Sequence, residues 1–185
     1  MIEIVDEAPA HVGARELLLD RAFGPDRYRK TSERLREGRL PAFAFSALEE
    51  DGTLVGTLRL WNVDMAGAQS VLLLGPLAVE ASCRSGGIGA RLMRQALNRA
   101  AVAGHSAILL VGDAPYYERF GFSASLTLGL ELPGPVERAR FLGLELQPHA
   151  LAAASGMVVP AGCVDPVFDQ VFPVSGSLGL AKRAA

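Results

Sequence analysis

The chain has 185 residues, of which half are hydrophobic and 21% are charged, with a formal net charge of −2 at pH 7. This length favours one domain with a substantial core, and the composition is typical of a globular chain. Such a charge balance gives no indication of nucleic-acid binding. The apolar runs are about as long as strands and are broken by glycine or charge, so no membrane-spanning helix is expected.

The N-terminus and the cysteines bear on the compartment and on metal binding. The first residues include early acids and lack the basic and then apolar pattern of a secretory signal, so we expect a cytoplasmic protein. Cys83 and Cys163 are too few for a disulfide framework or a zinc site. We interpret both as reduced, small hydrophobic residues, and we expect no bound metal.

The first third of the chain predicts short strands and two helical stretches. Pro9 ends the first strand, and Gly24-Pro25 ends the first helix. The second helical stretch carries five basic residues, and a charge run of this kind usually forms a solvated helix face. The expected strands cover residues 2–5, 43–49 and 53–63, and the expected helices cover residues 10–23 and 27–37.

The strongest signals lie between Leu74 and Phe122. An apolar run over residues 71–79 predicts a strand that ends in a polar loop. Glycines 86, 87 and 89 then open a segment with helical spacing of its apolar residues, and residues 107–111 predict a further buried strand. Such a unit directs the free N–H groups of the helix start, and the positive end of its dipole, beyond the first strand. An anion is the natural occupant.

The loop narrows the kind of anion. It lacks the Gly-Lys-Ser/Thr ending of a nucleotide P-loop, so nothing is there to reach a γ-phosphate or to hold magnesium. A dinucleotide fingerprint needs a small residue where Leu92 stands. What remains is Arg84 followed by glycines at the helix start. Arginine supplies a fixed charge and several donors, and glycine lets the backbone approach a pyrophosphate.

These residues carry a resemblance to a known family. Arg84-x-x-Gly87-x-Gly89-Ala90 resembles the acetyl-CoA signature of the GNAT superfamily of N-acetyltransferases, Arg/Gln-x-x-Gly-x-Gly/Ala. Residues 116–122 are similar to that family's closing pattern, in which a tyrosine, here Tyr117, stands four residues before a Gly-Phe pair. Two such signals in order, about 30 residues apart, are far more specific than either alone.

The resemblance implies a fold. We expect the α/β (α+β) GNAT fold, with a mixed, mostly antiparallel central sheet that is splayed between its fourth and fifth strands and has helices on both faces. Later strands are expected over residues 126–132 and 141–146. The GNAT domain is expected to span residues 1–147, with residues 148–185 as a C-terminal extension packed on the same domain or on a partner subunit. The protein is expected to be a monomer or a homodimer.

The resemblance also implies acetyl-CoA as cosubstrate and direct transfer of its acetyl group to a primary amine within a ternary complex. Gly75-Pro76 fits a disrupted ladder in the splayed strand. The backbones of Leu77, Ala78 and Val79 would bond to the pantetheine arm, and the Val79 N–H would polarise the thioester. The pyrophosphate would bind Arg84 and the backbone of Ser85, Gly86, Gly87, Ile88, Gly89 and Ala90.

Two further side chains are candidates for proton transfer. Tyr117 occupies the position of the family's tyrosine acid and would protonate the departing thiolate of CoA, unless it only packs under the cofactor. Tyr116 points elsewhere on the same short helix and is expected to pack or to line the acceptor site. Glu80, at the end of the splayed strand, is the candidate general base, although a solvated acid at a strand end is the simpler reading. His105 is expected at the opposite sheet edge from the cofactor loop.

Two functions from different classes stay open. The first is an acetyl-CoA-dependent N-acetyltransferase, and the second is a catalytically silent acyl-CoA-binding regulatory module that keeps the fold. In the family, the helices that correspond to residues 10–37 cover the acceptor side. Part of the charge run over residues 27–37 could therefore flank the acceptor site or contact a phosphate of CoA. The sequence does not indicate which amine is the acceptor.

Overall fold

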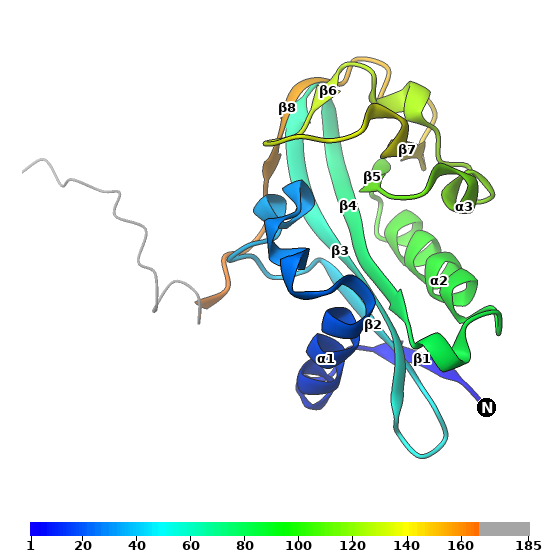
Figure 1. Ribbon diagram of the computed structural model, residues 1–185. Helices are drawn as coiled ribbons and strands as arrows, with labels where there is room; N and C mark the ends of the chain where they lie inside the picture. Colours follow the sequence, from blue (N-terminus) through cyan, green and yellow to red (C-terminus); the bar gives the residue numbers. More distant parts are fainter. Residues whose placement is uncertain (167–185) are drawn as a thin grey trace, which may run out of the picture.

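A mixed β-sheet forms the centre of the protein in the computed structural model, which describes residues 1–166 (Figure 1). Along the main path of the sheet the strands are ordered β1-β2-β3-β4-β5-β7. Every neighbouring pair on this path is antiparallel except β4 and β5, which are parallel. The strands are β1 (Glu3–Asp6), β2 (Phe43–Leu48), β3 (Leu54–Ala66), β4 (Ala68–Val79), β5 (Ala107–Val111), β6 (Leu130–Glu131), β7 (Phe141–Glu145) and β8 (Ser155–Pro160).

Helices cover both faces of this sheet. Successive side chains of β4 point to opposite faces, so its apolar residues contribute to a core on each side. Leu72 and Leu74 pack in one core cluster with the apolar face of α2 (Ile88–Val102), which includes Leu92. Leu73 packs on the other face, in a cluster that includes Leu35. The helix α1 (Val12–Phe23) lies on that second face, where Leu18 and Leu19 contact Ala78. The predicted fold class is therefore confirmed.

The fourth and fifth strands separate after a short stretch of pairing. β4 pairs with β5 only from Val71 to Leu73, although β4 continues to Val79. On its other edge β4 stays paired with β3, with a register shift between the pairs Leu60–Leu74 and Leu58–Leu77. This shift places one extra residue in β4, which forms a β-bulge at Gly75-Pro76. The Gly75 carbonyl accepts a hydrogen bond of 2.7 Å from Trp61 Nε1.

The predicted helix over residues 27–37 is wrong. This stretch forms two 3₁₀ segments, η2 (Pro25–Arg29) and η3 (Thr31–Leu35), separated by Lys30 in an extended conformation. Only a continuous apolar stripe would hold an amphipathic helix against the sheet, and Leu35 is the one fully buried hydrophobic residue here. The solvated face is also only partly correct, because Arg27 and Arg36 are buried.

The predicted strand over residues 126–132 is mostly wrong as well. Ala124–Thr127 forms a 3₁₀ turn that the Ser123 side chain caps, and only Leu130–Glu131 is a strand. The Thr127 hydroxyl bonds to Phe141 O at 2.7 Å, which holds the turn in place. The short helix α3 (Ala114–Glu118) and the 3₁₀ segment η6 (Arg138–Arg140) complete the elements that border the site.

Part of the expected C-terminal extension joins the main sheet. β8 pairs with β3 on the same edge as β2, and it also pairs with β6. The division at residue 147 stays a prediction, and residues 167–185 lie outside the described part of the chain. Within residues 1–166, no helix has the length and apolar character to cross a membrane.

Candidate active site

The glycine loop and the start of α2 present free backbone donors. Gly87 stands at the N-cap of α2 with φ 74°, a left-handed conformation that favours glycine, and no side chain caps this end. The helical ladder begins with Arg91 N, which donates to Gly87 O at 3.0 Å. The N–H groups of Ile88, Gly89 and Ala90 therefore have no partner within the helix. An anion placed here would be bonded by these groups and stabilised by the helix dipole.

A depression of about 440 Å³, which we call the loop cavity, lies against this helix start. It brings together most of the residues that the sequence predicts for the cofactor. Arg84, which makes no ion pair within residues 1–166, is exposed at its rim. Its lining consists of Leu77, Val79, Cys83, Arg84, Ser85, Gly87, Ile88, Gly89, Ala90, Tyr116 and Arg119. Of the predicted cofactor residues, Ala78, Gly86 and Tyr117 are not part of this lining.

Arg119 and Tyr116 are members of the loop cavity that sequence reasoning did not assign to the cofactor. The Arg119 guanidinium lies 4.0 Å from the centre of the Tyr116 ring. A Cβ atom on Gly89 would come within 2.7 Å of the Tyr116 hydroxyl, so this tyrosine reaches the first turn of α2. Arg119 lies within the sequence pattern of residues 116–122. Only the structure shows that α3 directs its side chain toward the glycine loop.

The backbone of β4 offers bonding groups at the splayed edge. Glu80 N donates to Val55 O on β3 at 2.8 Å, so the residues at alternate positions also bond toward β3. Leu77 and Val79 fall at the intervening positions, and their N–H and C=O groups point away from β3. No strand of residues 1–166 pairs with β4 on that edge beyond Leu73. The Ala78 side chain instead packs under α1, so only its backbone is relevant to a ligand.

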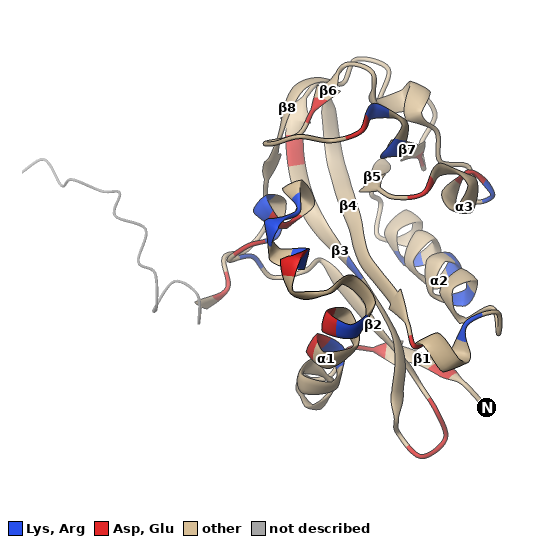
Figure 2. Ribbon diagram, viewed as in Figure 1, with Lys and Arg blue, Asp and Glu red and all other residues tan. Residues whose placement is uncertain are grey.

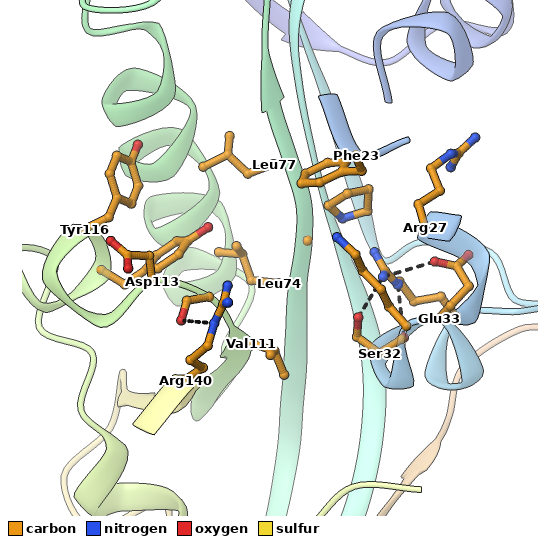
Figure 3. A pocket seen from close by; sticks show the side chains of 16 residues that line it. Phe23, Arg27, Ser32, Glu33, Leu74, Leu77, Val111, Asp113, Tyr116 and Arg140 are labelled. Carbon is orange, nitrogen blue, oxygen red and sulfur yellow. Dashed lines mark hydrogen bonds and ion pairs between the residues drawn. The ribbon is translucent and has the colours of Figure 1, made fainter. Parts of the chain in front are cut away.

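A second depression of about 430 Å³, the splay cavity, opens where β4 and β5 part (Figure 3). Figure 3 shows Leu74 and Leu77 along β4, with Tyr116, Asp113 and Arg140 on one side and Phe23, Ser32 and Glu33 on the other. Tyr117 also lines this cavity. Because Leu77 and Tyr116 line both cavities, the loop cavity and the splay cavity adjoin at these two residues.

The Tyr117 side chain is mostly enclosed by aromatic neighbours. Its ring centre lies 4.9 Å from that of Tyr116 and 6.0 Å from that of Phe122. Burial raises the pKa of the Tyr117 phenol to about 12, since the phenolate is poorly solvated there. The phenol is therefore protonated at neutral pH and able to donate a hydrogen bond into the splay cavity.

The predicted base Glu80 is engaged elsewhere. Its carboxylate accepts a 2.6 Å ion-pair bond from Arg21 of α1 and a 3.2 Å bond from Ala81 N. The hydrogen bond from Arg21 lowers the pKa of Glu80, which makes the carboxylate a weaker base. Glu80 lines neither the loop cavity nor the splay cavity. Nor does His105, whose Nδ1 lies 3.1 Å from Ser70 O.

A sheet that splits beside a glycine-rich helix start, with a tyrosine at the split, defines a class of acyl-CoA-dependent transferases. The chain belongs to the acetyltransferase (GNAT) family, whose model matches residues 13–122. The resemblance seen in the sequence is thereby confirmed.

Two bacterial proteins are similar to this chain over most of their length. The uncharacterized N-acetyltransferase YhbS of Escherichia coli K12 is 28% identical over 153 residues, which cover 82% of this chain and 92% of YhbS. The crystal structure of Escherichia coli YhbS with CoA superposes with a TM-score of 0.76 at 27% identity, covering 86% of this chain and 89% of YhbS. A GNAT acetyltransferase from Brucella melitensis in complex with acetyl-CoA gives a TM-score of 0.63 at 28% identity, covering 80% and 90% of the two chains.

Proposed function

We propose that this protein transfers the acetyl group of acetyl-CoA to a primary amine by direct attack. One observation carries the proposal: the loop cavity and the splay cavity adjoin at Leu77 and Tyr116, along the unpaired edge of β4. A pyrophosphate at the helix start and an acyl group at the split would thus belong to one extended ligand. The complexes of the two relatives with CoA and acetyl-CoA support this assignment.

The cofactor would be held by charge at one end and by backbone bonds along the arm. Arg84 and the N–H groups of residues 85–90 would bind the pyrophosphate. The pantetheine amides would pair with Leu77 and Val79, whose backbone groups point away from β3. Such pairing extends the sheet by a pseudo-strand, as peptides do at exposed sheet edges.

The chemistry needs a neutral amine and a stabilised oxyanion. With a pKa near 10.4, only about one alkylamine molecule in 2,500 is neutral at pH 7. Its nitrogen attacks the thioester carbon, and the charge that develops on oxygen is stabilised by a backbone N–H, for which Val79 is our candidate. The attacking nitrogen loses one proton to solvent and the C–S bond breaks, which releases the neutral amide and the thiolate of CoA.

Tyr117 would assist the departure of the sulfur. Its raised pKa of about 12 keeps the proton on the phenol before the thiolate forms. A CoA-like thiol has a pKa of about 8.5, so complete transfer of the proton from this phenol is uphill. The geometry therefore supports a hydrogen bond from Tyr117 to the departing sulfur. Glu80, the base predicted from its sequence position, stays the least supported member of the mechanism.

Calorimetric titration with acetyl-CoA tests the cofactor assignment. We expect micromolar binding that Arg84→Ala weakens by about tenfold to a hundredfold, because a charge-assisted bond contributes about 1.5–3 kcal/mol. The matched control is Arg94→Ala, which removes the same charge from an exposed site on α2 and should leave the affinity unchanged. No binding by the folded, unmodified protein would overturn the assignment.

Turnover of Tyr117→Phe separates an enzyme from a silent CoA-binding module. With a reactive amine, release of CoA thiol should slow by about a hundredfold in this variant, the lower range for a lost proton donor. Affinity for acetyl-CoA should stay within about threefold. Binding without any acetyl-CoA-dependent turnover across an amine panel would favour the regulatory module.

A further inference from the structure

Four basic residues line the splay cavity, although the proposed function brings a cationic amine to it. Basic residues occupy the 3₁₀ segments after α1 and, across β4, the stretch that precedes β7 (Figure 2). Two acidic residues, Glu33 and Asp113, also line the cavity. The basic lining residues are Arg27, Lys30, Arg36 and Arg140.

Two of these four cations are neutralised by their own partners. Arg27 Nε lies 2.7 Å from Asp20 Oδ1, and its Nη2 also bonds to Glu16. Arg36 Nη2 lies 3.1 Å from Glu33 Oε2. Both arginines are buried and ion-paired, so they support one wall of the cavity and are not available to pair with a ligand.

Lys30 is different, because no carboxylate within residues 1–166 pairs with it. Its ammonium lies 4.4 Å from the centre of the Phe23 ring, which also lines the cavity. Desolvation, together with the positive charges of Arg36 and Arg140, lowers the pKa of Lys30, against a smaller opposite effect of the Glu33 carboxylate. Lys30 therefore experiences the field of cations from both walls of the cavity.

Arg140 is the second unpaired cation, and it faces the cavity from the side of β5 and β7. Its backbone O accepts from Gly112 N at 2.9 Å, and its Nε donates to Gly112 O at 3.3 Å. These two bonds fix the base of the guanidinium beside the residue on which Tyr117 packs. Within the described part of the chain, no ion pair occupies its terminal nitrogens.

The balance of open charge bears on the acceptor. Lys30 and Arg140 contribute two positive charges, and Asp113, which makes no ion pair within residues 1–166, contributes one negative charge. A simple alkylammonium would enter against a net positive field. A molecule with both an ammonium and an acidic group would meet Asp113 with the former and the two cations with the latter.

We infer that the acceptor is a small amine that carries an acidic group, a carboxylate or a phosphate, which binds between Lys30 and Arg140. This inference rests on the proposed function. The cavity of about 430 Å³ lies within the range of small-molecule sites and suits an acceptor of this size. The acidic group would orient the amine toward Leu77 and Tyr116, where the two cavities adjoin.

Matched pairs of amines test the inference. 4-Aminobutyrate is compared with butylamine, and O-phosphoethanolamine with ethanolamine, by thiol release and by calorimetric binding to the CoA-loaded protein. We expect at least one acidic member to exceed its neutral partner by about tenfold or more in kcat/KM or in affinity. The carboxylate and phosphate pairs show which acid the site prefers. Equal or better performance of the neutral members, or no detectable binding of either acidic member, overturns the inference.

Variants locate the effect in the cavity. Lys30→Gln and Arg140→Gln should raise KM for the acidic amine by about tenfold, with a much smaller effect on KM for the neutral partner and on acetyl-CoA affinity. Arg29→Gln is the control, because Arg29 is highly exposed, pairs with Asp26 and does not line the cavity. An acidic amine whose KM is the same in all three variants contradicts the assigned residues. Loss of acetyl-CoA binding in the unmodified protein would instead count against the proposed function.

Discussion

The ring of Tyr117 lies directly against the backbone of Gly112. A Cβ atom built on Gly112 would overlap with Tyr117 Cε2 and come within 2.8 Å of Cδ2. The φ angle of Gly112 is not in the left-handed region, so no positive φ requires glycine at this position. The glycine is therefore required by the position of the tyrosine and not by the path of the chain.

Gly112→Ala should displace the Tyr117 ring and reduce turnover. We expect kcat to fall by about tenfold or more, because a hydrogen bond to the departing sulfur depends on placement, while acetyl-CoA affinity changes by less than about threefold. The control is Gly13→Ala, since a Cβ atom at Gly13 meets nothing within 4 Å. If both variants turn over like the unmodified protein, the position of Tyr117 has no part in catalysis.

The pH dependence should show no ionisation of Tyr117 in the usual assay range. Burial raises its pKa to about 12, so turnover should rise with pH as the amine loses its proton and should not fall below about pH 11 through this phenol. Rates measured from pH 6 to 10 check this. A descending limb in that range that disappears in Tyr117→Phe would show that the phenol ionises much earlier.

The raised pKa of Tyr117 should make the folded protein less stable as the pH rises above about 10. The pKa of an unfolded tyrosine is about 10, so between about pH 10 and 12 the folded chain holds more protons than the unfolded chain. The contribution of Tyr117 is complete below about pH 10 and is lost as the pH rises toward 12. Urea unfolding at pH 9 and 11 should show a smaller loss of stability for Tyr117→Phe than for the unmodified protein.

The parts of the site that sequence could predict are local in the chain. The strand over residues 107–111 has the predicted bounds, because a short apolar run is enclosed by turns and buried on both faces. The loop from Arg84 to Ala90 was found since its donors lie on consecutive residues. Arg140 could not be found this way, because the pairing of β5 with β7 brings it beside Gly112. Lys30 stood in a charge run whose pattern is typical of a solvated face.

The role of Glu80 as general base is the catalytic assignment that the geometry supports least. Glu80→Gln should keep kcat within about threefold, because the carboxylate is paired with Arg21 and lines neither cavity, whereas losing a general base costs about a hundredfold or more. Arg21→Gln breaks the same ion pair and is the matched control. Should only Glu80→Gln abolish turnover, Glu80 would be the base that its sequence position suggested.

Trp61 stabilises the bulge from which the splay begins. Its indole N–H donates to Gly75 O at 2.7 Å, and its side chain is almost fully buried. Trp61→Phe removes this donor from the half-buried Gly75 carbonyl, so the free energy of unfolding should fall by about 0.5–1.5 kcal/mol.

Circular dichroism during urea unfolding is the appropriate measurement for this variant, because Trp61 is the sole tryptophan of the chain and its fluorescence is lost with it. Since the bulge sets where β4 turns away from β5, the variant should also bind acetyl-CoA more weakly than its residual stability alone would explain. Wild-type stability together with wild-type affinity would mean that the ladder between β3 and β4 holds the bulge without the indole.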